Sequence, residues 1–302
     1  MSSRSAPAWL PFVVLAAAVL LVSSAAIVIR VAQGEGVGSL SIAAWRLSLA
    51  AAVLWPVTWS RNHAQIVALT PGEWMLGALS GVFLALHFAA WISSLAYTSV
   101  ASSLALVSTN PVWIALVSWL LFRERLDGWL LLGIAAAVGG SGLIFWSDAQ
   151  PTTSPGASHS MLGNVLALVG SLTVCGYLLI GRKLRKTVSL LPYIWLVYSS
   201  AALVLMITAF AAGSSLTGYS ATAWGCLVAL ALGPQLLGHS AFNWALKHVS
   251  ATFIAIAILG EPIGSAVLAW LIFDESFATI QLAGFCLLLA GIYLASRGEK
   301  AA

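Results

Sequence analysis

Ten long apolar segments constrain this chain more than any other feature of its sequence. A membrane-spanning helix needs about 20 predominantly apolar residues. Segments of that length lie at residues 9–31, 40–60, 74–97, 99–121, 128–147, 161–181, 190–212, 222–246, 251–273 and 277–296. Only 7% of the 302 residues are charged, whereas a soluble domain carries about 25%. The sequence therefore predicts an all-α membrane protein with ten transmembrane helices.

The first apolar segment resembles a secretory signal peptide, because Arg4 precedes it and it contains the small residues Ser23 to Ala26. The apolar run extends from Trp9 to Ile29, which is longer than the ~7–15 residues of a secretory apolar region. We therefore expect a first transmembrane span that is retained.

Several function classes lack their sequence signatures. The net charge of +4 in so apolar a chain reflects membrane topology rather than nucleic-acid binding. Cys175, Cys226 and Cys286 lie far apart in apolar runs, so neither a metal site nor a disulfide framework is predicted. The chain has no P-loop sequence, which argues against ATP hydrolysis. No cofactor is expected.

Lys and Arg residues are concentrated on one predicted side of the membrane. Eleven lie at the termini or in alternate loops: Arg4, Arg61, Arg123, Arg125, Arg182, Lys183, Arg185, Lys186, Lys247, Arg297 and Lys300. The opposite side has only Arg30, and Arg46 lies within the second span. Cytoplasmic loops carry an excess of Lys and Arg. Both termini are therefore predicted to be cytoplasmic, which requires an even number of spans.

An internal repeat relates the two halves of the chain. A constant shift of 151 residues superimposes Leu95 on Leu246, Pro111 on Pro262, Ala115 on Ala266, Trp119 on Trp270, Phe122 on Phe273, Glu124 on Glu275, Gly133 on Gly284 and Gly140 on Gly291. We predict a single transmembrane domain over 1–302, with repeat one at 9–147, a linker rich in Pro, Ser, Thr and Gly at 148–160, and repeat two at 161–297. Five spans is an odd number, so repeat two is inverted relative to repeat one. Inverted repeats are a recurring device of secondary transporters.

Two charged residues lie well inside predicted spans, namely Arg46 and Glu261. A charge at mid-bilayer costs roughly 2.5–3.5 kcal/mol on insertion scales, so it should face a cavity or a partner. Arg46 is expected either to bind a substrate carboxylate or to pair structurally with Glu261. Glu261 could bind a substrate ammonium, carry a coupling proton or neutralise Arg46.

Polar and aromatic side chains mark further candidate positions. Helical spacing places His239 and Asn243 on one face with Gln235, and His87 on one face with Trp91. Such stripes line a water-filled path or form hydrogen bonds between helices. Trp113 and Tyr177 also fall deep in apolar segments, where they either line a cavity or pack against other helices.

The dipeptides Asn110-Pro111 and Glu261-Pro262 occupy corresponding positions in the two repeats. Proline removes an intrahelical hydrogen bond. Midplane helix irregularities at matching positions of two halves point to a transporter site. Pro111 and Pro262 are therefore expected at helix breaks that serve gating, with a purely structural kink as the alternative.

These motifs together resemble the drug/metabolite transporter superfamily, in its EamA-type branch. The resemblance covers essentially the whole chain. It rests on Ala44-Trp45-Arg46-Leu47, on Asn110-Pro111-Val112-Trp113 followed by Phe122-Arg123-Glu124, on Tyr177 followed by Arg182, and on Gly260-Glu261-Pro262-Ile263. The first span departs from the family pattern, in which a lysine often follows a polar residue; Arg30 stands in that region here.

The resemblance implies a ten-span exporter of amino acids, related metabolites or drugs in a bacterial inner membrane. The Trp-rich character and the Asn-Pro-Val-Trp run are most similar to exporters of aromatic amino acids. We expect alternating access around a central cavity that binds a small molecule, with the bilayer as the other partner and a monomer compatible with this function. The residues expected to bind substrate are Arg46, His87, Trp91, Asn110, Trp113, Tyr177, His239, Asn243 and Glu261.

Three alternatives remain open at the level of sequence. The same fold could export other small metabolites or cationic drugs, which Glu261 would attract. A membrane-embedded enzyme could use Glu261 and a histidine as acid and base, although the chain has no nucleophile motif. A passive channel would need neither a midplane charge nor duplicated halves.

Overall fold

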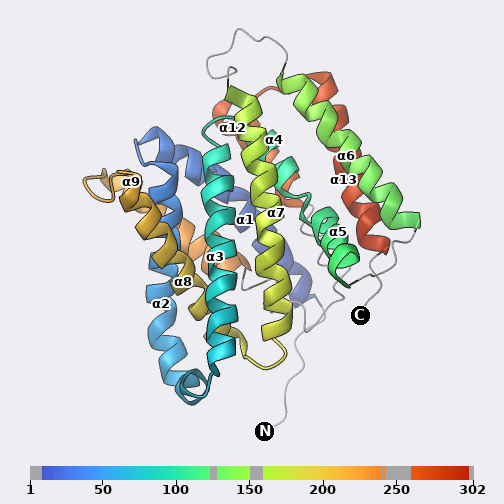
Figure 1. Ribbon diagram of the computed structural model, residues 1–302. Coiled ribbons are helices and arrows are strands. Elements are labelled where there is room, and N and C mark those ends of the chain that lie inside the picture. The colour runs from blue at the N-terminus through green and yellow to red at the C-terminus, as the bar shows by residue number, and fades with distance from the viewer. Residues whose placement is uncertain (1–8, 123–127, 150–158, 240, 242–259, 299–302) are drawn as a thin grey trace.

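The described residues of the computed structural model are 9–122, 128–149, 159–239, 241 and 260–298 (Figure 1). Within these ranges the chain forms helices and no strand. The helices are α1 (Leu10–Gly34), α2 (Ser39–Val67), α3 (Pro71–Ser94), α4 (Val100–Val107), α5 (Asn110–Phe122), α6 (Gly128–Asp148), α7 (Ser160–Leu184), α8 (Leu190–Ala211), α9 (Ala221–Leu230), the π-helix η2 (Ala231–Gly238), α12 (Gly260–Phe273) and α13 (Thr279–Gly298).

Seven of the described helices are long and apolar enough to cross a membrane. They lie at Phe12–Gly34, Ser39–Val67, Pro71–Ser94, Gly128–Asp148, Ser160–Leu184, Leu190–Ala211 and Ala221–Gly238. Shorter apolar helices at Val100–Ile114, Gly260–Phe273 and Thr279–Leu294 fall inside the predicted spans four, nine and ten. Ten complete spans therefore stay a prediction, because span 99–121 is divided between two helices and parts of spans 222–246 and 251–273 lie outside the described residues.

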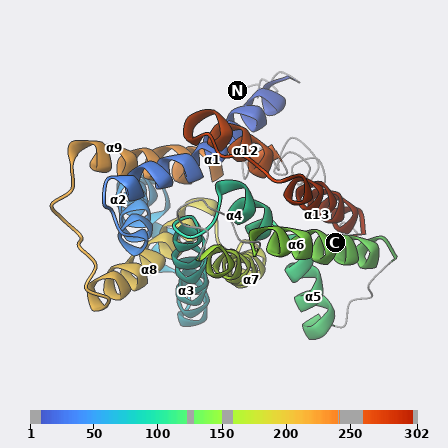
Figure 2. The ribbon, with the colours of Figure 1, turned by 90° about the horizontal axis from the view of Figure 1, so that it is seen from above.

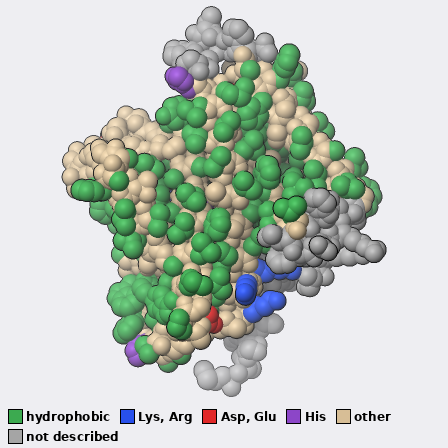
Figure 3. Space-filling view, in the orientation of Figure 1, with side chains coloured by type: hydrophobic (Ala, Val, Ile, Leu, Met, Phe, Trp, Pro, Cys, Tyr) green, Lys and Arg blue, Asp and Glu red, His purple; other side chains and the backbone are tan. Residues whose placement is uncertain are grey.

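The outer surface of the helix bundle is apolar. Figure 3 shows hydrophobic side chains spread across the whole visible face. Large apolar side chains such as Phe210 and Leu120 are 80% and 71% exposed. Exposed apolar area of this extent marks an interaction surface. On helices long enough to span a bilayer, lipid is the matching partner. The chain is therefore a multi-pass membrane protein.

The predicted span 99–121 is divided into two helices. The helix α4 ends at Val107 and α5 begins at Asn110. Pro111 has no N–H to continue the helix across this point, and proline disfavours a helical conformation in the residue before it. Thr109 stabilises the end of α4 instead, since its hydroxyl donates to the Leu106 carbonyl at 2.7 Å. Proline in the first turn of α5 costs no intrahelical bond.

The predicted span 222–246 also changes its helical form. Its first part, α9, is an α-helix, and from Ala231 to Gly238 it continues as the π-helix η2. Pro234 lies inside η2 and lacks the N–H that an α-helical bond to Leu230 would require. A π-helical turn places its side chains at angles that a regular α-helix does not, and such turns are frequent at functional sites.

The helices pack in pairs that match the sequence repeat. The helix α2 packs against α8, and α6 against α13, at opposite sides of the bundle (Figure 2). The helix α3 packs against α7, while α9 and η2 pack against α1. Under the 151-residue shift, α1 corresponds to α7, α2 to α8, α3 to α9 and η2 together, and α6 to α13. The shift therefore maps the α2–α8 and α6–α13 contacts onto themselves. It maps the α3–α7 contact onto the contact of α9 and η2 with α1.

Glycines bring α6 and α13 into backbone contact. A Cβ atom on Gly140 would lie 2.6 Å from the Leu288 nitrogen and 2.7 Å from the Gly284 oxygen. A Cβ atom on Gly291 would lie 2.5 Å from the Ala137 nitrogen. The antiparallel register therefore sets Gly140 against Gly284 and, within two helical turns, Gly291 against Gly133 and Ala137. Small residues at such contacts let membrane helices approach closely enough for favourable van der Waals packing.

This close approach predicts that Gly140→Ala destabilises the protein, by roughly 1–3 kcal/mol, because the added methyl group meets backbone that cannot rotate away. Gly142→Ala is the matched control on the same helix, since a Cβ atom there meets nothing within 4 Å. Thermal unfolding of the detergent-purified variants measures both. Equal melting temperatures for the two variants would show that the contact does not limit stability.

Candidate functional site

Arg46 is the largest fully buried side chain among the described residues. It lies on α2 and is only 1% exposed. Its Nε donates to Oε1 of Gln235 at 2.9 Å, and Gln235 projects from the π-helix η2. A buried guanidinium requires hydrogen-bond acceptors to offset its lost hydration. The π-helical turn of η2 thus supplies an acceptor to the buried cation.

Aromatic rings enclose the guanidinium of Arg46. Its central carbon lies 4.4 Å from the ring centroid of Phe88 and 5.8 Å from that of Trp91. The ring of His87 stacks on Trp91 at 6.0 Å with an interplanar angle of 16°. His87 is fixed by a 2.9 Å hydrogen bond between Nδ1 and the Gly170 carbonyl of α7. Cations are stabilised over aromatic faces, so α3 forms an aromatic wall for Arg46.

Two buried donors in this cluster have no hydrogen-bond partner among the described residues. They are Nη1 of Arg46 and Nε1 of Trp91. An unsatisfied buried donor costs about 1–3 kcal/mol, and more when it is charged. Native structures rarely leave such groups unpaired without a functional reason. An acceptor group between Arg46 and Trp91 would satisfy both, and a carboxylate has the right charge and geometry for the guanidinium.

Glu261 lies in the first turn of α12 and interacts electrostatically with Arg46. The two side chains form no ion pair within 4.0 Å; the ion pair in the described part of the chain joins Arg30 to Glu275. The helix is held against α1, because Ser265 donates to the Ser23 carbonyl at 2.8 Å. The structure therefore places Arg46 and Glu261 in one electrostatic cluster without a direct salt bridge.

The remaining predicted polar residues are divided between two places. His239 directly follows η2 and interacts electrostatically with Arg46 and His87. Tyr177 stacks on Tyr193 at 6.4 Å and interacts electrostatically with Tyr198, and Tyr198 connects it to the Arg46 cluster.

Asn110 and Trp113 lie at the α4–α5 break, against α7. The indole of Trp113 donates to Thr109 at 3.1 Å, and Thr109 is bonded in turn to Ser171 of α7 at 2.9 Å. The Asn110 carbonyl accepts a 3.5 Å hydrogen bond from Cys175. These hydrogen bonds place Asn110 and Trp113 at the helix break, and none of them reaches the Arg46 cluster. Asn243 lies outside the described residues.

Three residues of the cluster were not among the predicted site residues: Phe88, Tyr198 and Gln235. Tyr198 hydrogen-bonds to Gln235 and interacts electrostatically with Arg46. A signal existed for Gln235, which shares a helix face with His239. Tyr198 is a polar residue within an apolar segment, which is a weaker signal. Phe88 had none, because a phenylalanine in an apolar span is unremarkable in sequence.

The fold and this polar interior define a helical membrane protein with a buried charged cluster. The profile of the EamA-like transporter family matches the chain at residues 9–146 and again at 161–297. The chain therefore belongs to the EamA-like transporter family. The family and the transporter names of its relatives point to a transporter rather than an enzyme.

Two curated relatives are both 24% identical to this chain. One is the uncharacterized transporter sll1319 of Synechocystis sp., aligned over 71% of this chain and 64% of its own length. The other is the uncharacterized transporter YetK of Bacillus subtilis, aligned over 66% and 60%. The alignments thus span about three fifths of each relative. A solved crystal structure matches with a TM-score of 0.61 at 17% identity, covering 94% of this chain and 96% of that one, which indicates a shared fold.

Proposed function

We propose that this protein is a secondary exporter of amino acids, with aromatic amino acids as its main substrates, working by alternating access in a bacterial inner membrane. The observation that carries the proposal is the buried guanidinium of Arg46, with its unpaired Nη1 beside the unpaired indole nitrogen of Trp91. Arg46 would bind the substrate carboxylate. The rings of Phe88 and Trp91 would pack against an aromatic side chain.

Alternating access fits the burial of these donors. Arg46 is 1% exposed and Trp91 is 4% exposed, so a substrate reaches them only after the helices rearrange. A closed site of this kind is an expected state of a carrier and not of an open channel. Transport of this type needs at least two arrangements of the bundle, of which this structure represents one.

Ten spans in two inverted repeats, 9–147 and 161–297, are part of the proposal. The paired helix contacts support it, because a two-fold axis in the membrane plane would convert each contact into its counterpart. The register of α6 and α13 supports it further. Gly140 meets Gly284, and the 151-residue shift relates Gly140 to Gly291 and Gly133 to Gly284. A two-fold axis requires this reciprocal relationship.

The proposed orientation places both termini in the cytoplasm. The last turn of α7, at the lower end of the bundle in Figure 1, carries the exposed basic residues Arg182 and Lys183. Figure 3 shows Lys and Arg side chains in the lower part of the same view. The relatives from Synechocystis and Bacillus subtilis support a bacterial membrane.

Purified protein in liposomes tests the substrate directly. We expect saturable flux of labelled aromatic amino acids, with competition by unlabelled aromatic amino acids and little competition by small polar ones. An inactive preparation is excluded by counterflow with the same panel. The absence of saturable, competable flux of any amino acid would overturn the proposal.

A second cargo class is favoured by one observation, the carboxyl group of Glu261 near Arg46 without a direct salt bridge. Glu261 would attract a cationic metabolite or drug. Flux of organic cations that exceeds the flux of every amino acid in the same liposomes would favour this alternative.

A further inference from the structure

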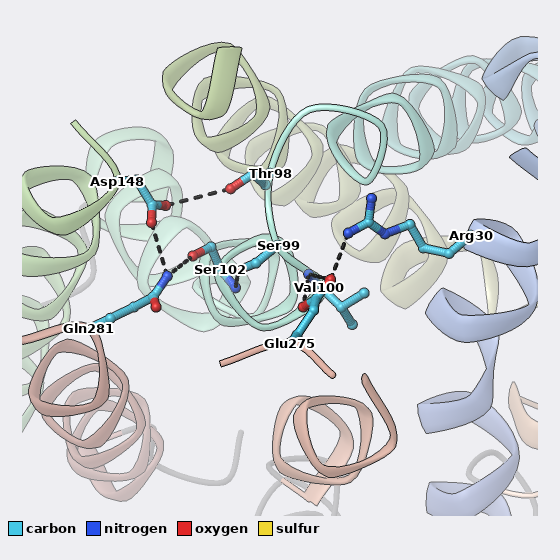
Figure 4. Close-up of polar contacts among 8 residues, drawn as sticks. All are labelled: Arg30, Thr98, Ser99, Val100, Ser102, Asp148, Glu275 and Gln281. Carbon is cyan, nitrogen blue, oxygen red and sulfur yellow. Dashed lines mark hydrogen bonds and ion pairs between the residues drawn. The ribbon is translucent and has the colours of Figure 1, made fainter. Parts of the chain in front are cut away.

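A cluster of polar contacts closes one end of the helix bundle, far from the basic end of α7. Figure 4 shows its members, which come from α1, α4, α6, α13 and the connections next to them. At its centre, Nη2 of Arg30 lies 2.6 Å from Oε1 of Glu275. Glu275 follows α12, so this ion pair joins the first half of the chain to the second. No other ion pair occurs in the part of the chain that the structure describes.

The carboxylate of Glu275 makes a second contact with the first half of the chain. Its Oε2 accepts a 3.0 Å hydrogen bond from the backbone N–H of Val100, the first residue of α4. The first N–H groups of a helix have no intrahelical acceptor, and the helix dipole favours an anion there. Glu275 therefore neutralises Arg30 and caps α4 at once (Figure 4).

The backbone before Glu275 adopts a conformation that aims it at this position. Asp274 has φ of 52°, the one positive value at a non-glycine residue among those described. This left-handed conformation is unfavourable for L-residues, although Asp tolerates it better than most. It reverses the chain directly after α12. Strain of this kind persists where the surroundings stabilise it and is often found at switch regions.

A second layer of hydrogen bonds supports the same closure. Nε2 of Gln281 on α13 donates to Ser102 of α4 at 2.8 Å and to Asp148 of α6 at 2.9 Å. Asp148 also accepts from Asn164 of α7 at 2.7 Å. Four helices of both halves thus converge on one small polar cluster.

The ion pair lies nearer this end of the molecule than Glu261 does, as their contacts with α1 show. Ser23 of α1 contacts the backbone of Glu261, and Arg30 follows Ser23 by seven residues on the same helix. At 1.5 Å per residue, the ion pair lies about 10 Å beyond the level of Glu261. A substrate leaving the Arg46 cluster toward this end would meet it.

We propose that Arg30, Glu275 and the N-terminus of α4 form a latch that holds this end of the transporter closed and must open in each transport cycle. The inference rests on the proposed transport function. It also gives a role to Arg30, the one basic residue on its predicted side of the membrane: Arg30 is a gating residue and not a determinant of topology.

Reversible cross-linking tests the latch. In a variant with Cys175, Cys226 and Cys286 replaced by alanine, Arg30→Cys and Glu275→Cys are combined and treated with a short bis-methanethiosulfonate reagent. We expect amino-acid flux to fall at least about tenfold and to recover when dithiothreitol removes the cross-link. Substrate binding, followed by tryptophan fluorescence, should persist in the cross-linked protein. Single-cysteine variants with the same reagent are the controls.

The outcomes separate the latch from the transport function. Full flux after complete cross-linking, verified by mass spectrometry, would overturn the latch. Absence of flux in the untreated parent would instead count against the proposed function.

A second measurement does not depend on the cysteine pair. Ser102→Cys, in the same cysteine-free background, reports on the space beneath the latch, because Ser102 is fully buried. In this protein, adding Glu275→Gln should raise the rate at which the cysteine at position 102 reacts with a membrane-impermeant maleimide at least about fivefold. The reason is that the charge that holds Arg30 and α4 is gone. Glu35→Gln is the matched control, because Glu35 bonds to Ser220 in a connection outside the latch. Equal rates in both variants would contradict the proposal.

Discussion

Replacing Arg46 with glutamine is expected to lower the flux of carboxylated substrates by about 100-fold or more. Truncating one partner of a buried, hydrogen-bonded charge pair costs about 2–5 kcal/mol, and each 1.4 kcal/mol is a factor of ten. The Arg46 guanidinium is the buried cation of the cluster, and its unpaired Nη1 is the donor that a carboxylate would engage. Initial rates in liposomes, with labelled phenylalanine as substrate, measure the effect.

Arg61→Gln is the matched control for Arg46→Gln. It makes the same chemical change on the same helix, but Arg61 is exposed, and we expect its flux to stay within about twofold of the parent, as surface charges contribute little. Phenethylamine, which lacks the carboxylate, should not lose flux relative to the parent protein when Arg46 is replaced. If phenylalanine and phenethylamine lost flux equally, Arg46 would be a structural residue and not a carboxylate ligand.

The Glu261→Gln variant is expected to retain substrate exchange but to lose the dependence of net flux on an imposed pH gradient. Glu261 is the carboxyl group that interacts electrostatically with Arg46, so a proton on it changes the field at the substrate carboxylate. Glutamine keeps the size and hydrogen-bonding capacity of the side chain but cannot exchange a proton in this way. Substrate counterflow at equal pH and net flux under a pH gradient measure the two properties separately.

Glu35→Gln serves as the control for coupling, because it removes an exposed carboxyl group outside the cluster. We expect its gradient dependence to match that of the parent. If both the flux and the gradient dependence of Glu261→Gln survive unchanged, proton coupling through this residue must be abandoned.

The membrane character and the positions of most helices follow from the sequence, because hydropathy over about 20 residues is a strong signal. The two irregular helices follow only in part. Pro111 marks the division between α4 and α5, yet the sequence does not say that the helix ends at Val107 rather than bending. Pro234 likewise marks η2 only once its π-helical form is known, because a proline is compatible with several local adjustments.

Sequence patterns do not identify the residues that contact Arg46. Helical periodicity places residues on a face of their own helix, but it carries no information about which face of another helix lies opposite. Sequence alone therefore leaves two alternatives for Arg46, a substrate carboxylate and Glu261. The hydrogen bond to Gln235 depends on the contact of α2 with η2, and the aromatic wall depends on the contact of α2 with α3.

The glycine contact between α6 and α13 has an evolutionary consequence. Because the two helices offer each other equivalent positions, one half-length sequence would supply both sides when two copies met in opposite orientations in a membrane. Fusion of two such copies would leave this contact under a shared constraint, since a side chain at Gly140 or Gly291 meets backbone of the other helix. Positions away from this contact would be free of the shared constraint. Asn110 and Glu261, which occupy matching places in the two halves, are different residues.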